Sequence, residues 1–115
     1  MNVINIIEAL SKHPSGTFLN VLKFNHHHIG ACDITGESPV WEMHPDTDEF
    51  FYILEGKFEI TLLDGDIPSH HTVGPGSSFV VPESIWHKPA APKGCKFIYL
   101  TPGTSLHSEL EDPRV

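Results

Sequence analysis

The chain has 115 residues, which suits one folding unit, because a second hydrophobic core would lack apolar surface. Its 15 acidic side chains outnumber 7 basic ones, and the formal net charge of -8 repels phosphate backbones and anionic membrane surfaces. We therefore expect a single domain over residues 1–115, with neither nucleic acid nor a membrane as a partner.

The composition favours an all-β protein, because 10 prolines and 9 glycines supply many tight turns to a chain that is 39% hydrophobic. The N-terminal residues lack the basic-then-apolar order of a secretory signal, so the expected compartment is the cytoplasm.

Cys32 and Cys95 form no CxxC pair. We expect free buried thiols there rather than a disulfide.

The first predicted element is a short N-terminal helix. Val3, Ile7 and Leu10 recur at helical spacing, with Asn2 available as a cap. Residues 4–6 alternate as a strand would, so both a helix and a strand remain open for this segment.

From residue 17 the pattern changes to short runs typical of β-strands, bounded by turn residues such as Pro92-Lys93-Gly94. Within one run Phe58, Ile60 and Leu62 share a face, which we predict to be the core face. Regularly spaced strands predict a sandwich or barrel over residues 17–101, followed by a C-terminal tail, residues 102–115, that is loosely ordered or packed on a partner. The predicted strands cover residues 17–24, 27–34, 40–43, 49–54, 57–63, 78–81, 86–88 and 96–100.

Three residues are candidate metal ligands: His44 and Glu49, which flank residues 45–48, and His87 in a separate segment. Two imidazoles and one carboxylate can hold a divalent metal on one face and leave other coordination positions open. Strand parity places Glu42 on the same side as His44. Pro45 interrupts the strand with a turn, which allows His44 and Glu49 to face one cavity.

From Glu49 onward, strand parity sends Phe51 and Ile53 inward, beneath the carboxylate. Phe51 is therefore a candidate cavity wall, and other aromatic residues either line the same cavity or serve only packing. These other aromatic residues are Trp41, Trp86 and Tyr99.

The spacing around the first two candidate ligands resembles the first sequence motif of the cupin family. That motif reads G-x5-H-x-H-x3,4-E-x6-G, and Glu42 stands where its first histidine belongs. The positions that match are Gly36, His44, Glu49 and Gly56.

The segment around His87 resembles the second cupin motif, G-x5-P-x-G-x2-H-x3-N. Gly76, Pro82 and His87 match it, whereas Ser84 and Ala91 depart from its glycine and asparagine. Together the two motifs extend over residues 36–91, about half of the chain.

The resemblance implies a small single-domain cupin, a jelly-roll β-barrel with a divalent metal near its axis. By this resemblance, His44, Glu49 and His87 stand at positions that are metal ligands in the family. Glu42 replaces an imidazole with a carboxylate, so it either coordinates as a fourth ligand, acts as a general base, or turns away from the ion. The metal could be Zn, Mn, Fe, Ni or Cu, since histidine and carboxylate ligands accept all of them. Small cupins usually form homodimers, and apolar residues 3–10 could supply such a contact.

The histidines outside the two motifs are weaker candidates for the metal site. One of His26, His27 or His28 could replace the imidazole missing at position 42, but consecutive strand residues alternate faces, so the three cannot converge on one ion. Solvated side chains are expected at His70 and His71, in a loop, and no function is assigned to His13 and His107.

Two functions follow from such a site. The first is a metal-dependent enzyme of the oxygenase or isomerase class acting on a small organic molecule. The second is a non-catalytic module that binds or senses a small molecule; a vacant scaffold is a third, structural reading. The sequence has no phosphate-binding loop and no nucleophile elbow, so metal chemistry is the catalytic possibility that remains.

Overall fold

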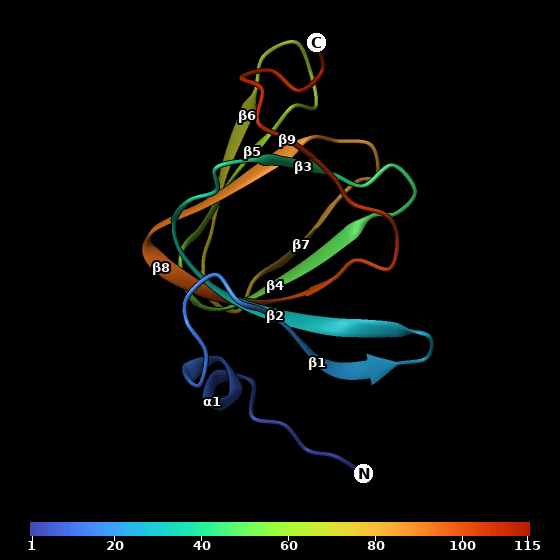
Figure 1. Cartoon of the computed structure of the whole chain (residues 1–115). Coiled ribbons are helices and arrows are strands. Elements are labelled where there is room, and N and C mark those ends of the chain that lie inside the picture. Colours follow the sequence, from blue (N-terminus) through green and yellow to red (C-terminus); the bar gives the residue numbers. More distant parts are fainter.

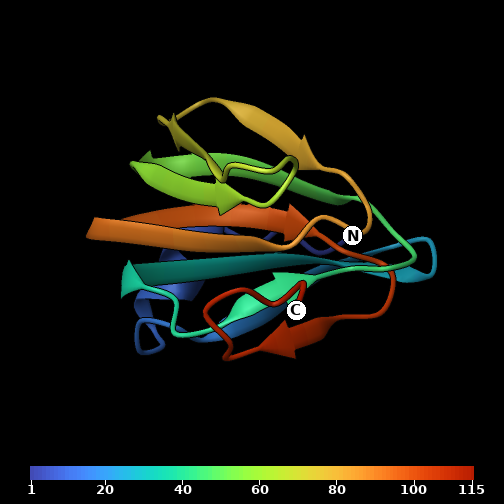
Figure 2. The ribbon, with the colours of Figure 1, turned by 90° about the horizontal axis from the view of Figure 1, so that it is seen from above.

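The computed structural model describes residues 1–115, and its nine strands form one curled sheet that wraps around as a jelly-roll barrel (Figure 1). The elements are α1 (Ile6–Ser11), β1 (Phe18–Phe24), β2 (His27–Glu37), β3 (Trp41–Met43), β4 (Glu49–Gly56), β5 (Phe58–Leu62), β6 (Ser69–Val73), β7 (Ser78–Val81), β8 (His87–Leu100) and β9 (Leu106–Ser108). Figure 2 shows β8 between one group of strands, β4 to β7, and a second group, β1, β2, β3 and β9.

Strand β8 connects the two groups because it pairs antiparallel with β2, β3, β4 and β5. The sequence predicted two short strands here, separated by a turn at residues 92–94, and that prediction is wrong. Ile34 pairs with Cys95 but Gly36 pairs with Ala91, so β8 has extra residues between these pairs. They form a bulge, which bends the strand without reversing it.

The barrel interior is filled by side chains from the inner faces of its strands. Phe58 and Ile60 are buried and Leu62 packs against them, whereas Glu59 is exposed, which confirms the predicted core face. The buried core residues are Cys32, Phe51, Ile53, Phe58, Ile60, Val81, Ala91, Cys95 and Phe97.

Helix α1 covers the outer face of the sheet below β1 and β2 (Figure 1). Of the helix and the strand that the sequence left open here, the structure has the helix, and its cap is Asn5 rather than Asn2, because the Asn5 side chain accepts a hydrogen bond from the backbone N–H of Glu8 at 2.9 Å. Leu10 is buried beneath it, while Val3 is 84% exposed. None of the helices has the length and apolar character that crossing a bilayer requires. The homodimer stays a prediction.

Two strands were not predicted. His70 and His71 lie in β6, which pairs with β5, and not in a loop. The tail is also not loose throughout, since β9 pairs with β3. Neither strand shows the alternation of a half-buried strand, because most of their side chains face solvent. Backbone pairing alone defines them.

Both cysteines, Cys32 and Cys95, are free and buried, as expected. Burial raises the pKa of each thiol to about 11. They therefore stay protonated and pack as small apolar side chains.

Ser84 occupies the glycine position of the second motif and keeps a left-handed backbone, with φ of +66°. Its backbone N–H donates to the carbonyl oxygen of His44 at 2.7 Å. This hydrogen bond ties the loop after β7 to the loop after β3, so the two motif segments meet at one end of the barrel.

We expect Gly56→Ala to lower the free energy of unfolding by at least about 2 kcal/mol, because Gly56 has φ of +77° and a Cβ there would overlap the carbonyl oxygen of Gly94. Gly74→Ala is the matched control, since a Cβ at Gly74 meets no atom within 4 Å. Urea unfolding of both variants measures the difference. Equal losses would contradict this account of the β4–β5 turn.

Candidate metal centre

The first two site residues come from the end of β3. Glu42 lies in the strand and His44 directly follows it, so both project to the same side, as their parity predicted. His44 Nε2 lies 3.2 Å from Oε1 of Glu42. Trp41 projects to the other side, where its ring lies 5.6 Å from the Lys88 ammonium.

The turn after His44 is held by two aspartates. Asp46 accepts hydrogen bonds from the backbone N–H and the hydroxyl of Thr104, at 2.8 and 3.0 Å. Asp48 accepts one from the backbone N–H of Glu83 at 2.9 Å. These contacts reverse the chain direction, so β4 starts with Glu49 pointing back toward His44.

His87 enters the site from the first position of β8, where it is the cross-strand partner of both Glu42 and Leu62. Partners on adjacent antiparallel strands point to the same face of the sheet. The pairing of β8 with β3 therefore brings together side chains that are far apart in the sequence.

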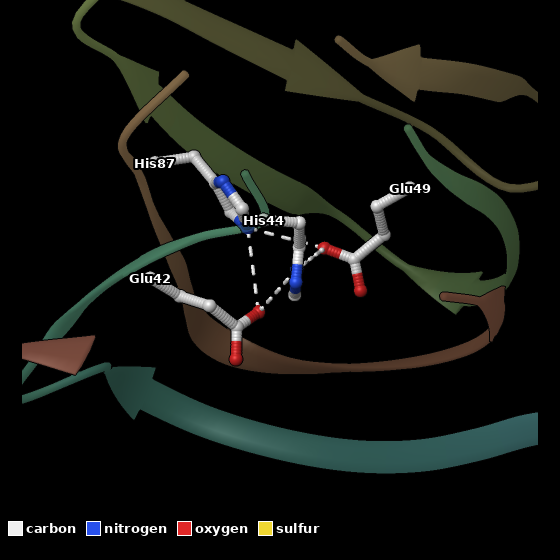
Figure 3. Close-up of side chains that lie close together, drawn as sticks. All are labelled: Glu42, His44, Glu49 and His87. Atoms are coloured by element: carbon white, nitrogen blue, oxygen red, sulfur yellow. Dashed lines mark hydrogen bonds and ion pairs between the residues drawn. The ribbon is translucent and has the colours of Figure 1, made fainter. Parts of the chain in front are cut away.

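The four side chains point toward one another (Figure 3). Oε1 of Glu49 lies 3.2 Å from Nε2 of His44 and 3.1 Å from Nε2 of His87. Oε1 of Glu42 lies 3.4 Å from the same atom of His87. One ligand atom from each residue falls within 4.8 Å of the others, and three of the four residues are buried.

Both imidazoles are oriented by hydrogen bonds at their other ring nitrogen. Nδ1 of His44 donates to the carbonyl oxygen of Thr104 at 3.0 Å, and Nδ1 of His87 donates to that of Ile85 at 3.1 Å. With Nδ1 bonded to a backbone carbonyl, Nε2 is the ring nitrogen that is available to a metal, an arrangement common around metal sites.

The carboxylates change the acid–base behaviour of the imidazoles. Burial alone would lower the pKa of His44, but Glu42 and Glu49 outweigh it and raise this pKa to about 10. Burial likewise opposes the rise at His87, whose pKa reaches about 9 through the same two carboxylates. Without a metal, the imidazoles are held as cations at neutral pH.

The pKa values of the two carboxylates shift in the opposite direction, downward. Burial favours the protonated form of Glu42, yet His44 and His87 lower its pKa well below the usual range. The same two imidazoles, together with the Thr101 hydroxyl that donates to Oε2, lower the pKa of Glu49 against its burial. Both carboxylates are therefore ionised and available as ligands.

The donor set fits a divalent metal. Two carboxylates neutralise its charge, and two imidazoles add the nitrogen ligands that Zn, Mn, Fe, Ni and Cu accept. Nε2 of His87 is buried and makes no hydrogen bond, although carboxylate oxygens of Glu42 and Glu49 lie 3.4 and 3.1 Å from it. Buried polar atoms without partners are rare, and an ion among the four residues would satisfy this one.

The four residues lie at one side of a cavity of about 480 Å³. Phe51 and Tyr99 form part of its wall, whereas Trp41 and Trp86 do not contribute. Glu42, His44, Glu49 and His87 share the lining with Phe18, Ile34, Ser38, Pro39, Val40, Phe51, Pro89, Phe97, Tyr99, Thr101, Ser105 and His107.

The other predicted histidines do not join the site. His26, in the turn after β1, and His27 and His28, at the start of β2, are exposed, and none of them lines the cavity. His70 and His71 are exposed on β6. No second group of potential metal ligands exists in the chain.

The sequence interpretation missed the C-terminal segment that surrounds the site. Thr101 contacts Glu49, Thr104 and Ser105 contact His44, and His107 contacts Glu42. His107 had received no function. No local pattern marks these residues, because their partners lie 52 to 65 positions earlier in the chain.

Known proteins share this architecture. A family model described as a cupin domain matches residues 33–107, so the chain belongs to the cupin family. A cupin-2 domain protein from Shewanella frigidimarina superposes with a TM-score of 0.78 at 30% identity, over 87% of this chain and 94% of its own. No curated protein matches the sequence significantly.

Two structures of hydroquinone 1,2-dioxygenase also superpose, each with a TM-score of 0.72. One, from Sphingomonas sp. TTNP3 with 4-hydroxybenzoate bound, is 16% identical and covers 84% of this chain and 71% of its own. The other, in complex with Cd²⁺ and 4-hydroxybenzonitrile, is 17% identical and covers 87% of this chain and 72% of its own. At these identities the likeness shows the fold alone.

We expect metal binding to release about two protons near neutral pH, because the pKa values of about 10 for His44 and about 9 for His87 leave both imidazoles protonated beforehand. Affinity should accordingly rise with pH until it passes those values. Calorimetric titration with Zn²⁺ in buffers of different ionisation enthalpy measures the proton count. An affinity that stays constant from about pH 6 to about pH 8 would show that the imidazoles do not bind the ion.

Proposed function

We propose that this cupin holds a divalent metal with His44, Glu49, His87 and Glu42, and that the ion acts on a small organic molecule in the adjoining cavity. The observation that carries this proposal is the convergence of four ligand atoms within 4.8 Å at the side of a cavity of about 480 Å³. A volume in this range suits a small-molecule ligand.

In this proposal, Nε2 of each imidazole and one oxygen of each carboxylate hold the ion. A divalent ion in such a site polarises a bound carbonyl or hydroxyl oxygen, and as iron(II) it can support oxygenase chemistry. The chain's own contribution is to orient the ligands: the Thr101 hydroxyl engages Oε2 of Glu49, while Oε1 faces the imidazoles.

The cavity walls favour a small substrate that is planar and largely apolar. Phe51 and Phe97 have ring centroids 5.5 Å apart, and Phe97 and Tyr99 are 6.1 Å apart, with ring planes tilted by 52° and 55°, so three adjoining aromatic rings contribute to the wall. Burial raises the pKa of the Tyr99 hydroxyl to about 12, which keeps it protonated as a hydrogen-bond donor. We infer an aromatic or enolic substrate with at least one oxygen that can reach the ion.

The comparison with hydroquinone 1,2-dioxygenase supports this choice of substrate class. The two bound molecules, 4-hydroxybenzoate and 4-hydroxybenzonitrile, are both phenols. The same donor set and cavity would also suit an isomerase acting on an enolisable carbonyl compound, because a divalent ion polarises a carbonyl oxygen. Dioxygenase chemistry is therefore the first assay and isomerisation the second.

We expect the purified protein, after dialysis against Mn²⁺, Fe²⁺ or Zn²⁺, to retain about one equivalent of metal. His44→Ala and His87→Ala should each weaken metal binding by more than about 100-fold, because each removes a ligand. Metal content and competition with a chelating dye measure this. His71→Ala, an exposed histidine on β6, is the control.

The metal site is disproved if the wild type retains no metal, or if the two ligand variants bind as tightly as the control. Circular dichroism of the metal-free variants separates loss of a ligand from loss of the fold.

We expect the Fe²⁺-loaded protein to consume oxygen with at least one member of a panel of phenols, hydroquinones and diketones. Val40→Phe should abolish this uptake and leave metal affinity unchanged, because Val40 lines the cavity without contributing a ligand. An oxygen electrode makes the measurement. Saturable binding of a panel member without any turnover would instead indicate a non-catalytic binding module.

A further inference from the structure

Glu42 is flanked by histidines on both neighbouring strands. Its cross-strand partner on β8 is His87, and its partner on β9 is His107. Directly opposed residues of antiparallel strands project to one face of the sheet, so these three side chains form a row that faces the cavity. His107 lines that cavity although its side chain is 53% exposed.

The two carboxylate oxygens of Glu42 have different partners. Oε1 faces the metal-binding atoms of His44 and His87, at 3.2 and 3.4 Å. Oε2 accepts a hydrogen bond from Nε2 of His107 at 2.9 Å. The carboxylate is therefore held with one oxygen toward the centre and the other turned toward β9.

Such an orienting contact matters more for a carboxylate than for an imidazole. The cupin motif has histidine at position 42, and an imidazole presents one ring nitrogen to a metal. A carboxylate can bind an ion through one oxygen or through both. A hydrogen bond at Oε2 biases the choice toward one oxygen, which leaves a coordination position open for a substrate.

Other residues of the C-terminal segment also contact proposed ligands at the atom that faces away from the metal centre. Thr101 donates to the outer oxygen of Glu49, and the carbonyl of Thr104 accepts from the outer nitrogen of His44. Thr104 is itself anchored to Asp46. Three of the four proposed ligands are thus oriented by residues 101–107, and only His87 is oriented by its own loop.

We propose that His107 is a positioning residue that sets Glu42 as a one-oxygen ligand of the metal centre. This inference rests on the proposed function in one respect, that Glu42 coordinates. An ordinary surface ion pair between the two residues would contribute little to stability and would leave the metal centre unchanged. The two explanations therefore predict different metal affinities for a variant that lacks the His107 side chain.

The test uses the full chain with His107→Phe, His107→Gln, Glu42→Ala and the double variant of Glu42→Ala with His107→Phe. His28→Phe, at an exposed strand position away from the cavity, is the matched control. Affinity for Zn²⁺ is measured by chelator competition, and the Co²⁺ form is examined by visible absorption, which reports coordination number. Thermal unfolding of the metal-free proteins checks that β9 remains docked.

We expect His107→Phe to weaken Zn²⁺ binding about 10-fold and to change the Co²⁺ spectrum, as is usual for residues that orient a ligand. His107→Gln keeps an N–H donor, so it should bind within about 3-fold of the wild type. In the Glu42→Ala background His107→Phe should have no further effect, because the group it orients is gone.

The inference is overturned if His107→Phe binds as the wild type does while Glu42→Ala weakens binding; the proposed metal site would then stand without it. It is also overturned if His107→Phe causes the same loss with and without Glu42, since that result assigns the effect to strand docking. A wild type that takes up no Zn²⁺ refutes the proposed function and this inference together.

Discussion

Two carboxylates and two imidazoles share the interior of this barrel, and each pair makes the burial of the other possible. An isolated buried charge costs several kcal/mol, so neither Glu49 nor the protonated form of His87 would be stable there alone. Their mutual attraction keeps the carboxylates ionised and the imidazoles protonated when no metal is present. In the proposed function a divalent cation takes the place of these protons and binds Nε2 of His87, the one buried side-chain nitrogen that has no hydrogen-bond partner.

The four residues come together because the central strand, β8, pairs with strands on both sides of the barrel. Strand β8 pairs with four neighbours, and its first residue is one of the site histidines. A bulge at residues 92–94 bends β8 between the pairs it makes at its two ends. The site therefore sits where the two groups of strands meet, with the aromatic core beneath it and the cavity beside it. The four side chains lie at strand ends and in short hydrogen-bonded loops, which limits their conformational freedom.

The C-terminal segment surrounds the four site residues and forms hydrogen bonds with three of them. Cupins share the barrel, but here Glu42 stands in place of a motif histidine, and residues 101–107 contact that carboxylate and two other ligands. The replacement of an imidazole and the docking of β9 are therefore parts of one arrangement. If Glu42 binds a metal as proposed, metal binding and the docking of β9 stabilise each other by the same free energy.

The sequence by itself predicted the barrel, the core face of β5 and three candidate ligands, His44, Glu49 and His87, and it left the role of Glu42 open. These signals are local: alternation along a half-buried strand, turn residues at its ends, and two motifs with fixed spacing. It did not reveal β6 or β9, which lack apolar alternation because most of their side chains meet solvent. It also suggested a turn at residues 92–94, because a bulge and a turn use the same residue types. Strand parity predicted the side on which Glu42 lies, but only the tertiary structure decided which of its oxygens faces the imidazoles, since that depends on His107, 65 positions away, and on strand pairing that no local pattern encodes.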